Sequence, residues 1–536
     1  SVRTQEGVPV IEVAGAWHAS LEPSKRSRSP LERALLRHVV ARRWFRSKAR
    51  GAKAIRITDS VALTSGAQAP RLLVLEVQLN DGDPERYVLV VAPTELPQDH
   101  TFAEVVVKTK RGTEVLFLTD VSESAEVADL LVSLLHRKKI RGGELCVRGS
   151  SSLPAAELAG VSARALGREQ SNTSFVLGDI ALLKMLRQVE PGQSTELEVL
   201  EHLKGTPDLS VPALLGHLEL SWDSGETATL GIFQALVPNQ GDAWQLALEE
   251  LRRYYELALM ERLEGPNVPR IDGSPLSQVR ATAPQILRDR TGLWLSRIEL
   301  LGQRTGELHI ALAAADEGAF APDNFNALNR RSLYQSIRNL ASRTFDLLKA
   351  NAQPSELLTQ VLSREKRLRT RLSFLIDSQV AAKRIRVHGD FHLGQVLSSG
   401  SDFVIIDFEG EPARALADRR RKRCPLADVA SMLRSFHYAA FGVLTGDVPG
   451  SDVRQEDVPF LTPWAELWCH WTSARYLAGY LDAVADAELL PTDPAHLETL
   501  LDLYCVEKAL YEIGYELNHR PGWAKIPMLG LLAAVE

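Results

Sequence analysis

Hydrophobic and polar positions alternate along the first part of the chain and repeat with helical spacing along the second. The alternation predicts strands at 54–62, 71–79, 86–93, 173–178, 180–186, 214–220 and 228–236. The helical spacing predicts helices at 29–42, 122–136, 195–204, 241–262, 276–314, 323–350, 354–380, 425–441, 463–485 and 494–517. A strand-rich part followed by a helical part indicates two lobes, so the predicted fold class is α+β.

The same pattern divides the chain into four segments. These are residues 1–28, 29–100, 101–237 and 238–536. The first is expected to be a linker, in which Val10, Ile11 and Val13 could form a short edge strand. The second is predicted to be a small α+β unit in which nothing suggests chemistry. The third is predicted to be mostly β and the fourth mostly helical.

Composition is that of an ordinary globular protein with no overall positive charge to attract nucleic acid or anionic lipid. Of its 536 residues, 45% are hydrophobic and 24% are charged, and the formal net charge is −6. This balance argues against nucleic acid or anionic lipid as a partner. Four widely spaced cysteines offer neither a zinc motif nor a disulfide framework, which fits a reducing cytoplasm. No apolar run approaches the roughly 18 residues that a membrane span needs.

A polar stretch inside the helical part carries the strongest candidate chemistry. Two short apolar strands flank a loop that contains Asp390 and Gln395, and Asp407 follows the second strand. Phosphoryl transfer requires a carboxylate to orient a hydroxyl, and oxygen ligands for a hard cation. Asp390 is therefore predicted to be the catalytic base, and Gln395 and Asp407 to be ligands of Mg²⁺. The alternative is that the two acids cap helices.

Two histidines lie on either side of Asp390. A zinc site would require a helix and a third ligand, so His388 and His392 are not predicted to bind zinc. His388 is predicted to pack within the loop. His392 is predicted to line the substrate site, with a packing role equally open.

A lysine in a strand is the candidate for binding nucleotide phosphates. Lys184 lies among apolar residues, where an unpaired charge would be costly, and Glu198 in the following helix is its predicted partner. The alternative is an edge-strand lysine with a solvated tip. No glycine-rich loop precedes this lysine. The polar turn that could instead hold phosphate through backbone N–H groups and hydroxyls is Gln170, Ser171, Asn172, Thr173 and Ser174.

The strand-rich and helical parts are joined by residues 233–238. An extended segment with free backbone N–H and C=O groups can bind the edge of an adenine ring. Gln234 and Leu236 are therefore candidate nucleotide contacts. The alternative is an ordinary linker.

The basic run at 419–423 is interpreted as a solvated loop that could also neutralise nearby acids or contact phosphate. Asp428, in the helix that follows, is interpreted as a structural residue.

One face of the last predicted helix carries two phenols, a cation and an anion. These residues are Lys508, Tyr511, Glu512 and Tyr515, and their spacing places them on one side of the helix. Aromatic faces combined with charged hydrogen-bonding groups suit a sugar, so this face is a candidate acceptor site. The alternative is a half-buried helix that packs on the rest of the lobe.

Several extended stretches resemble the bacterial maltokinases. They are Arg43-Trp44-Phe45, Glu169-Gln170-Ser171-Asn172-Thr173-Ser174, Gln240-Gly241-Asp242-Ala243-Trp244, His388-Gly389-Asp390-Phe391-His392-Leu393-Gly394-Gln395, Ile406-Asp407-Phe408-Glu409-Gly410-Glu411-Pro412, Asp428-Val429-Ala430-Ser431-Met432-Leu433-Arg434-Ser435-Phe436 and Tyr511-Glu512-Ile513-Gly514-Tyr515-Glu516-Leu517. A glutamine at 395, where generic small-molecule kinases have asparagine, is itself typical of maltokinases.

The resemblance implies a bilobal, eukaryotic-kinase-like fold of the aminoglycoside phosphotransferase type. It implies that 29–100 is a cap subdomain, that 101–237 is the kinase N-lobe with an intermediate subdomain, and that 238–536 is the C-lobe. The implied activity is ATP-dependent, Mg²⁺-dependent phosphorylation of maltose at its anomeric hydroxyl. The product, maltose 1-phosphate, serves α-glucan (glycogen) synthesis from trehalose.

The resemblance also assigns roles to residues. By position, Asp390 is the base, Lys184 binds phosphate, and Lys508, Tyr511 and Tyr515 line the maltose site. Glu512 is added from helical spacing alone. The first residues look like the join that follows trehalose synthase in fused chains, so a fused or associated trehalose synthase is an expected partner.

Two alternative functions stay open at this point. One is a kinase of the same fold that acts on another acceptor, such as glucosamine or an aminoglycoside. The other is a catalytically silent module that binds sugar or tethers a fused synthase, against which the candidate catalytic residues argue.

Overall fold

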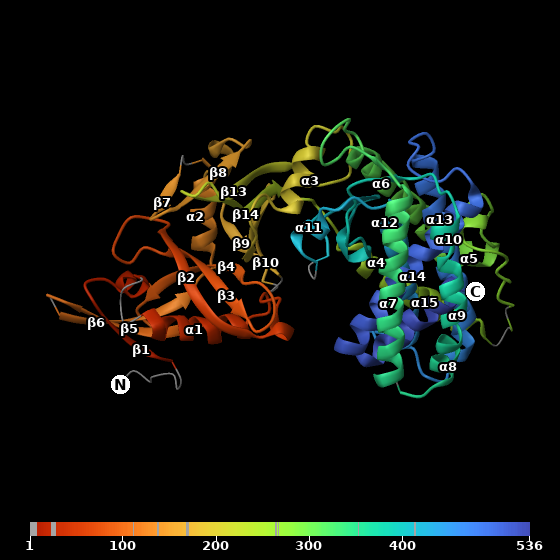
Figure 1. The fold of residues 1–536 in the computed structure, drawn as a ribbon, viewed down its shortest axis with the longest axis horizontal. Coiled ribbons are helices and arrows are strands. Elements are labelled where there is room, and N and C mark those ends of the chain that lie inside the picture. Colours follow the sequence, from red (N-terminus) through yellow and green to blue (C-terminus); the bar gives the residue numbers. More distant parts are fainter. Residues whose placement is uncertain are drawn as a thin grey trace. The chain divides into compact units, whose positions relative to one another are not determined.

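The chain forms two compact units, shown in Figure 1. The computed structural model describes residues 8–22, 28–110, 112–136, 139–167, 171–262, 265, 267–351, 353–411 and 414–535. The first unit consists of Ser1–Glu201 with Pro212–Leu236, and the second of His202–Val211 with Val237–Glu536. After Leu236 the rest of the chain belongs to the second unit. This transition lies within one residue of the boundary predicted between residues 237 and 238.

The first unit contains a mixed sheet buried on both faces. Its strands, in spatial order, are β1 (Val10–Ala14), β5 (Thr101–Thr109), β6 (Gly112–Asp120), β4 (Glu85–Thr94), β3 (Arg71–Leu79) and β2 (Ala52–Ala62), and β12 (Gln188–Val189) pairs with β4. Alternate residues of β3 face opposite sides, as a pleated strand requires. Leu73 and Leu75 pack with helix α1 (Arg28–Ala41), whereas Leu72 and Val74 pack in a second core.

The second sheet of this unit supplies the other side of that second core. Its strands, in spatial order, are β7 (Ile140–Gly142), β8 (Leu145–Ser151), β13 (Leu214–Trp222), β14 (Thr227–Ala235), β11 (Ala181–Leu186), β10 (Asn172–Leu177) and β9 (Ala163–Ala165). Helix α2 (Ala125–His136) packs into the same core with both sheets. Helix α3 (Thr195–Leu203) follows β12 and leads toward the second unit.

The boundary expected near residue 100 does not coincide with a break in the first sheet. Strands β5 and β6 pair with β1 and β4, so the sheet continues to Asp120. The alternation of hydrophobic positions did not predict these two strands. The short strand expected around Val10 is present at the edge of the sheet, and it pairs with β5 in parallel.

The second unit is built from helices and two small sheets. Its helices are α4 (Ala243–Met260), α5 (Gln285–Thr291), α6 (Trp294–Leu312), α7 (Ala327–Asn351), α8 (Glu356–Ser363), α9 (Glu365–Leu372), α10 (Phe374–Asp377), α11 (Leu416–Arg419), α12 (Leu426–Leu444), α13 (Val458–Ala483), α14 (Pro494–His519) and α15 (Lys525–Val535). The sheets pair β15 (Asp323–Asn324) with β16 (Lys383–Arg384), and β17 (Val396–Ser399) with β18 (Asp402–Ile405).

Two predicted helices are broken in the structure. The segment 276–314 divides because Pro284 precedes α5 and Gly292, at a φ of 53°, ends it before α6 begins. The segment 354–380 divides into α8, α9 and α10. Among the described residues, no helix is long and apolar enough to cross a membrane.

The helical core depends on a close approach of α6 and α13. Gly302 of α6 and Gly479 of α13 each face the backbone of the other helix, so a Cβ atom at Gly479 would overlap the carbonyl oxygen of Glu299. Stacked Trp294 and Trp468 continue the contact, with ring centroids 5.3 Å apart. Because helices pack this closely only over small residues, the two glycines fix the spacing of the core.

We expect Gly479→Ala to destabilise the helical unit by about 1–3 kcal/mol, since the added methyl group must push α6 and α13 apart. Thermal unfolding followed by circular dichroism measures the change. Gly514→Ala is the matched control, because a methyl group at this α14 glycine would meet no neighbouring group within 4 Å. Alanine there should leave the melting temperature unchanged or raise it. Equal melting temperatures for the two variants would contradict the packing argument.

Candidate functional site

The polar stretch of the second unit brings two predicted cation ligands together. The hairpin of β17 and β18 places Gln395 beside the residues after β18, and the N–H of Ile406 donates to the Gln395 carbonyl at 3.0 Å. The side-chain amide of Gln395 then donates to Asp407 Oδ2 at 2.9 Å. With its NH₂ group turned to Asp407, the amide oxygen is the atom left for a cation. This oxygen donor set fits Mg²⁺.

Asp407 has a backbone conformation that side chains rarely adopt. Its φ is 69°, in the left-handed region. Such a conformation is maintained only where the surrounding structure imposes it, and these positions cluster at functional sites. Here it turns the chain directly after β18 so that the carboxylate reaches Gln395.

A buried carboxylate on α12 holds the start of the loop. Asp428 accepts the backbone N–H of His388 at 2.7 Å and that of Gly389 at 3.0 Å, and it contacts His309 Nε2 at 3.2 Å. Burial alone would raise the pKa of Asp428, but the partners His309, His388 and Gly389 outweigh it and lower the pKa. The predicted structural role of Asp428 is therefore specific, since it fixes the two residues before Asp390.

The two loop histidines differ in their surroundings. His388 lies between Phe391 and Phe408, with ring centroids 5.2 Å away in each case, and its Nε2 contacts the carbonyl of Ile406 at 2.9 Å. It packs within the loop. His392 instead has its Nε2 3.9 Å from Asp390 Oδ2. Burial lowers the pKa of His392, so its ring is neutral near pH 7.

Asp390 also meets the first residue of the candidate sugar-binding face. Lys508 Nζ of α14 lies 3.9 Å from Asp390 Oδ1 and 5.3 Å from the ring centroid of Tyr511. Burial and the neighbouring carboxylate of Glu411 raise the pKa of the Tyr511 phenol, so this hydroxyl stays protonated. The structure therefore gathers a carboxylate, a cation and a phenol around Lys508.

The other two residues of that face differ, because Glu512 is engaged in an ion pair, whereas the assignment of Tyr515 to the sugar site stays a prediction. Tyr515 is 44% exposed and stacks on His519, with ring centroids 4.3 Å apart. Glu512 accepts a hydrogen bond from Arg434 Nε at 2.9 Å and is largely buried. Its carboxylate therefore belongs to an ion pair between α14 and α12, which corrects its assignment to the sugar site. Residues three or four positions apart on a helix share a side only approximately. Glu512 is turned away from Lys508 and Tyr511 far enough to reach Arg434 of α12.

Lys184 is paired as expected, but with a different carboxylate. Its Nζ donates to Glu196 Oε2 at 2.7 Å, and the Glu196 side chain is 2% exposed. Glu198, the predicted partner, lies two positions further along α3. Residues two apart lie on different sides of a helix, and Glu196 is the glutamate whose carboxylate accepts the hydrogen bond from Lys184. The spacing from Lys184 could not distinguish the two glutamates.

The predicted phosphate turn is largely a strand. Gln170 lies outside the described residues, Ser171 precedes β10, and the remaining three residues belong to β10. Ser174 lies directly opposite Lys184 in the register of β10 and β11, and Asn172 shares its face. Thr173 faces the opposite side, where its hydroxyl accepts a hydrogen bond from Arg187 Nε at 2.9 Å. This contact corrects the assignment of Thr173 to the phosphates.

The predicted adenine-binding segment begins in β14. Gln234 is buried there and pairs with Leu182 on one side and Leu214 on the other. The N–H of Leu236 donates to the carbonyl of Ile180 at 3.0 Å. This N–H is therefore not one of the free backbone groups that the prediction expects in this segment, and the nucleotide contacts of Gln234 and Leu236 stay a prediction.

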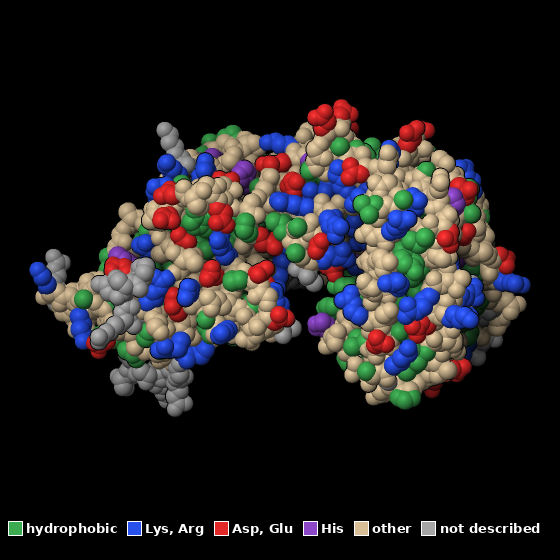
Figure 2. All heavy atoms as spheres, viewed as in Figure 1, with side chains coloured by type: hydrophobic (Ala, Val, Ile, Leu, Met, Phe, Trp, Pro, Cys, Tyr) green, Lys and Arg blue, Asp and Glu red, His purple; other side chains and the backbone are tan. Residues whose placement is uncertain are grey.

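The basic run at 419–423 supports the loop after Asp407. Figure 2 shows Lys and Arg side chains gathered around α11 of the second unit. Arg419 Nη1 donates to the carbonyl of Glu409 at 3.3 Å, and Arg423 forms an ion pair with Glu507 of α14. The run is therefore more than a solvated loop.

Comparison with known proteins places this arrangement in a kinase fold. Residues 38–120 match the family described as Maltokinase N-terminal cap domain. A glucosamine kinase of Streptacidiphilus jiangxiensis is 24% identical over 373 residues, which are 68% of this chain and 71% of that protein. A glucosamine kinase of Mycolicibacterium smegmatis (strain ATCC 700084 / mc(2)155) is 25% identical over 377 residues, which are 69% of this chain and 78% of that protein.

Solved structures agree with the sequence comparison. A glucosamine kinase in complex with glucosamine, ADP and inorganic phosphate superimposes with a TM-score of 0.61 and 18% identity, covering 97% of this chain and 99% of the other. The chain has the kinase-like fold with an N-terminal maltokinase cap domain. The prediction of an α+β kinase-like fold, with a cap, a β-rich N-terminal part and a helical C-terminal part, is confirmed.

We expect Asp428→Asn to destabilise the helical unit by about 2–4 kcal/mol near pH 7, because the amide has one acceptor oxygen where the carboxylate has two. The pKa of this carboxyl lies below its ordinary value of 3.8 in the folded protein. Its contribution is therefore fully present above about pH 5 and is lost as the pH falls below the unfolded value.

Chemical denaturation of both proteins at a series of pH values measures this dependence. The difference in unfolding free energy should be constant between about pH 6 and 8 and should shrink below about pH 4. Asp486→Asn, at an exposed carboxylate, serves as the control. Equal stability of the wild type and Asp428→Asn at pH 7 would rule out the anchoring role.

Proposed function

We propose that the protein is an ATP-dependent kinase that phosphorylates maltose at its anomeric hydroxyl, giving maltose 1-phosphate for α-glucan synthesis from trehalose. The observation that carries the proposal is the position of Asp390 beside Lys508 and Tyr511, in a chain with a maltokinase cap domain. The kinase fold and the named kinases among the relatives support the reaction type. The cap domain supports the acceptor.

In the proposed reaction, the oxygen of the sugar hydroxyl forms a bond to the terminal phosphorus of ATP, and the bond from that phosphorus to ADP breaks. Asp390 accepts the proton that the sugar hydroxyl loses. Lys508, whose ammonium group lies 3.9 Å from Asp390 Oδ1, donates a hydrogen bond to the sugar. Neutral His392 supplies a further hydrogen bond without adding charge. Most of the rate enhancement in such sites comes from positioning and charge stabilisation.

Gln395 and Asp407 are the residues that would hold Mg²⁺. A cation bound there neutralises charge on the nucleotide phosphates. Lys184, held by Glu196, is assigned to those phosphates as well. Ser174 lies opposite Lys184 in the strand register and is the residue of the polar turn best placed to join it.

Glucosamine is the second candidate acceptor, because both named relatives are glucosamine kinases. An amino sugar is a cation near pH 7 and would be repelled by the ammonium group of Lys508, 3.9 Å from the proposed base. A neutral disaccharide meets no such repulsion and can stack on Tyr511. The charge beside Asp390 therefore favours maltose.

We expect Asp390→Asn to lower kcat for sugar phosphorylation by roughly three orders of magnitude, since the amide cannot accept the proton. Binding of ADP, followed by calorimetry, should change by less than about twofold, because this carboxylate is assigned to the sugar. Asp486→Asn is the control for an exposed carboxylate and should keep full activity. Near-normal turnover of Asp390→Asn would remove Asp390 from the catalytic role.

With maltose, glucose, glucosamine and kanamycin offered separately with ATP and Mg²⁺, we expect the highest kcat/KM for maltose. Phosphorylation at the anomeric position removes the reducing end, so loss of reducing sugar and ³¹P resonance measurements identify the product. A higher kcat/KM for glucosamine than for maltose would show that the proposed acceptor is wrong, while the proposed reaction type, phosphoryl transfer from ATP, would stand. No ATP turnover with any sugar would favour a silent binding module.

A further inference from the structure

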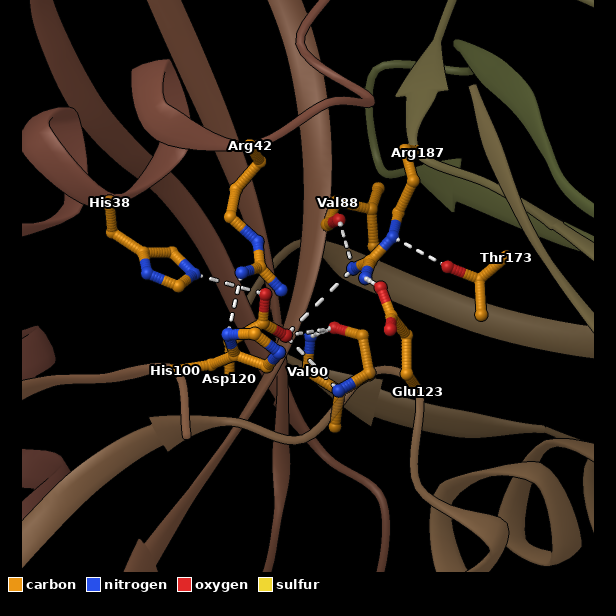
Figure 3. A network of polar contacts seen from close by, with 10 residues as sticks. His38, Arg42, Val88, Val90, His100, Asp120, Glu123, Thr173 and Arg187 are labelled. Carbon is orange, nitrogen blue, oxygen red and sulfur yellow. Dashed lines mark hydrogen bonds and ion pairs between the residues drawn. The ribbon is translucent and has the colours of Figure 1, made fainter. Parts of the chain in front are cut away.

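A fully buried arginine lies where the chain crosses between the two sheets of the first unit (Figure 3). Arg187 follows β11, which belongs to the second sheet, and precedes β12, which pairs with β4 of the first sheet. Its side chain is 0% exposed. Its carbonyl accepts the N–H of Val88 at 2.7 Å. The first sheet is called the cap sheet below, because most of its strands lie within residues 38–120, which match the cap domain family. The strand that carries Lys184 is therefore continuous with β12, a strand of the cap sheet.

The guanidinium group of Arg187 has partners in both sheets. Its Nε donates to Thr173 Oγ1 of β10 at 2.9 Å, and its Nη1 donates to the carbonyl of Val88 of β4 at 3.5 Å. Its Nη1 lies 3.9 Å from Asp120 Oδ1 at the end of β6, and its Nη2 lies 3.5 Å from Glu123 Oε1. Trp44 covers the group, with the ring centroid 5.0 Å away. A planar group with five donors suits such a junction.

Asp120, the main carboxylate of this network, is fixed from the cap side. It accepts hydrogen bonds from the N–H and Oγ of Ser122 at 3.1 and 2.5 Å and contacts His38 Nε2 at 3.1 Å. Burial alone would raise the pKa of Asp120, but Arg187 and His38 outweigh this effect and lower the pKa below its ordinary value. The carboxylate is therefore ionised.

A second cap contact lies beside these residues. Arg42 Nη1 meets His100 Nδ1 at 2.5 Å, and His100 has a φ of 72°, which non-glycine residues rarely adopt. Figure 3 shows both side chains next to Asp120. The network that receives Arg187 is thus braced by the part of the chain that matches the cap domain family.

Lys184 of β11 and Arg187, directly after that strand, project to opposite sides of the sheet. Side chains alternate along a strand, so residues three apart face opposite sides. Arg187 enters the core between the sheets, whereas Lys184 meets Glu196 on the other face. Any displacement of the end of β11 moves the Lys184 ammonium group directly. Misplacement of a charged group by about 1 Å can change rates 100-fold.

We propose that Arg187 is a positioning residue through which the cap domain holds Lys184 in place for nucleotide phosphates. The inference rests on the proposed function, because that function assigns the phosphates to Lys184. It gives the cap domain a role in nucleotide affinity, separate from the acceptor sugar.

The test compares Arg187→Gln and Arg187→Lys with the wild type. We expect Arg187→Gln to raise the Kd of ADP and the KM of ATP about 10-fold, while the KM of the acceptor stays within twofold. Arg187→Lys should fall between, because an ammonium group keeps the charge but cannot join Thr173 and Asp120 together. Calorimetry measures ADP binding, and initial rates give the two KM values.

A buried arginine in the other unit provides the matched control. Arg290 is 3% exposed, stacks on Trp464 with its guanidinium 3.9 Å from the ring centroid, and pairs with Glu261. Arg290→Gln should lower the melting temperature as Arg187→Gln does, without raising the Kd of ADP. A purely structural role for Arg187 predicts the same result for both variants.

A double-mutant cycle tests whether Arg187 acts through the lysine. In the Lys184→Ala background, Arg187→Gln should cause no further loss of ADP affinity, since the group that it positions is gone. If Arg187→Gln fails to fold, Arg187→Met combined with Asp120→Leu removes both buried charges together, which is often tolerated. This double variant should show the same rise in the Kd of ADP.

Two outcomes would overturn the inference. One is a folded Arg187 variant whose ADP affinity stays within twofold of the wild type. The other is an additive effect of Arg187→Gln in the Lys184→Ala background. Failure of the proposed function looks different, because the wild type itself would then bind no ADP or phosphorylate no sugar, and absence of ADP binding also removes the role given to Arg187.

Discussion

The arrangement of the polar stretch around Asp390 depends on one buried carboxylate. Asp428 on α12 binds two consecutive backbone N–H groups just before Asp390, while Ser435 of the same helix accepts the N–H of Leu393 just after it. Both ends of the segment that carries the proposed base are therefore tied to a single rigid helix. A flexible loop could not hold Asp390 within reach of Lys508 on α14 without such support.

The same principle recurs in the first unit with opposite charge. There, a buried guanidinium joins the strand of Lys184 to the cap sheet, and Thr173 and Asp120 bind it from two sides. In each unit, a fully enclosed ion satisfies backbone or hydroxyl groups close to a residue assigned to chemistry. Replacing a buried ion together with all its partners by apolar groups often costs little stability, whereas removing the ion alone leaves its buried partners unsatisfied, so each ion holds the groups around it in one arrangement.

Long, regular patterns were predictable from the sequence, and local orientation was not. Strands β3 and β10 follow from alternation, and the grouping of Gln395 with Asp407 follows from a loop between two short strands. The sequence predicts Glu198 as the partner of Lys184, whereas the structure pairs Lys184 with Glu196, because spacing along the chain does not reveal which side of α3 faces the strand. The assignment of Thr173 to the phosphates is wrong because the expected polar turn is the start of β10, where successive side chains point to opposite faces.

The borders of the family match do not coincide with the borders of the cap sheet. Upstream of residue 38, β1 covers the outer side of β5, and β12, far downstream, occupies part of β4. A fragment cut at 38 and 120 would leave the N–H and C=O groups of both strands unpaired and open to association with other chains. A cap that keeps this sheet fully paired must therefore include β1 upstream of the family match and β12, which follows Lys184 in the chain.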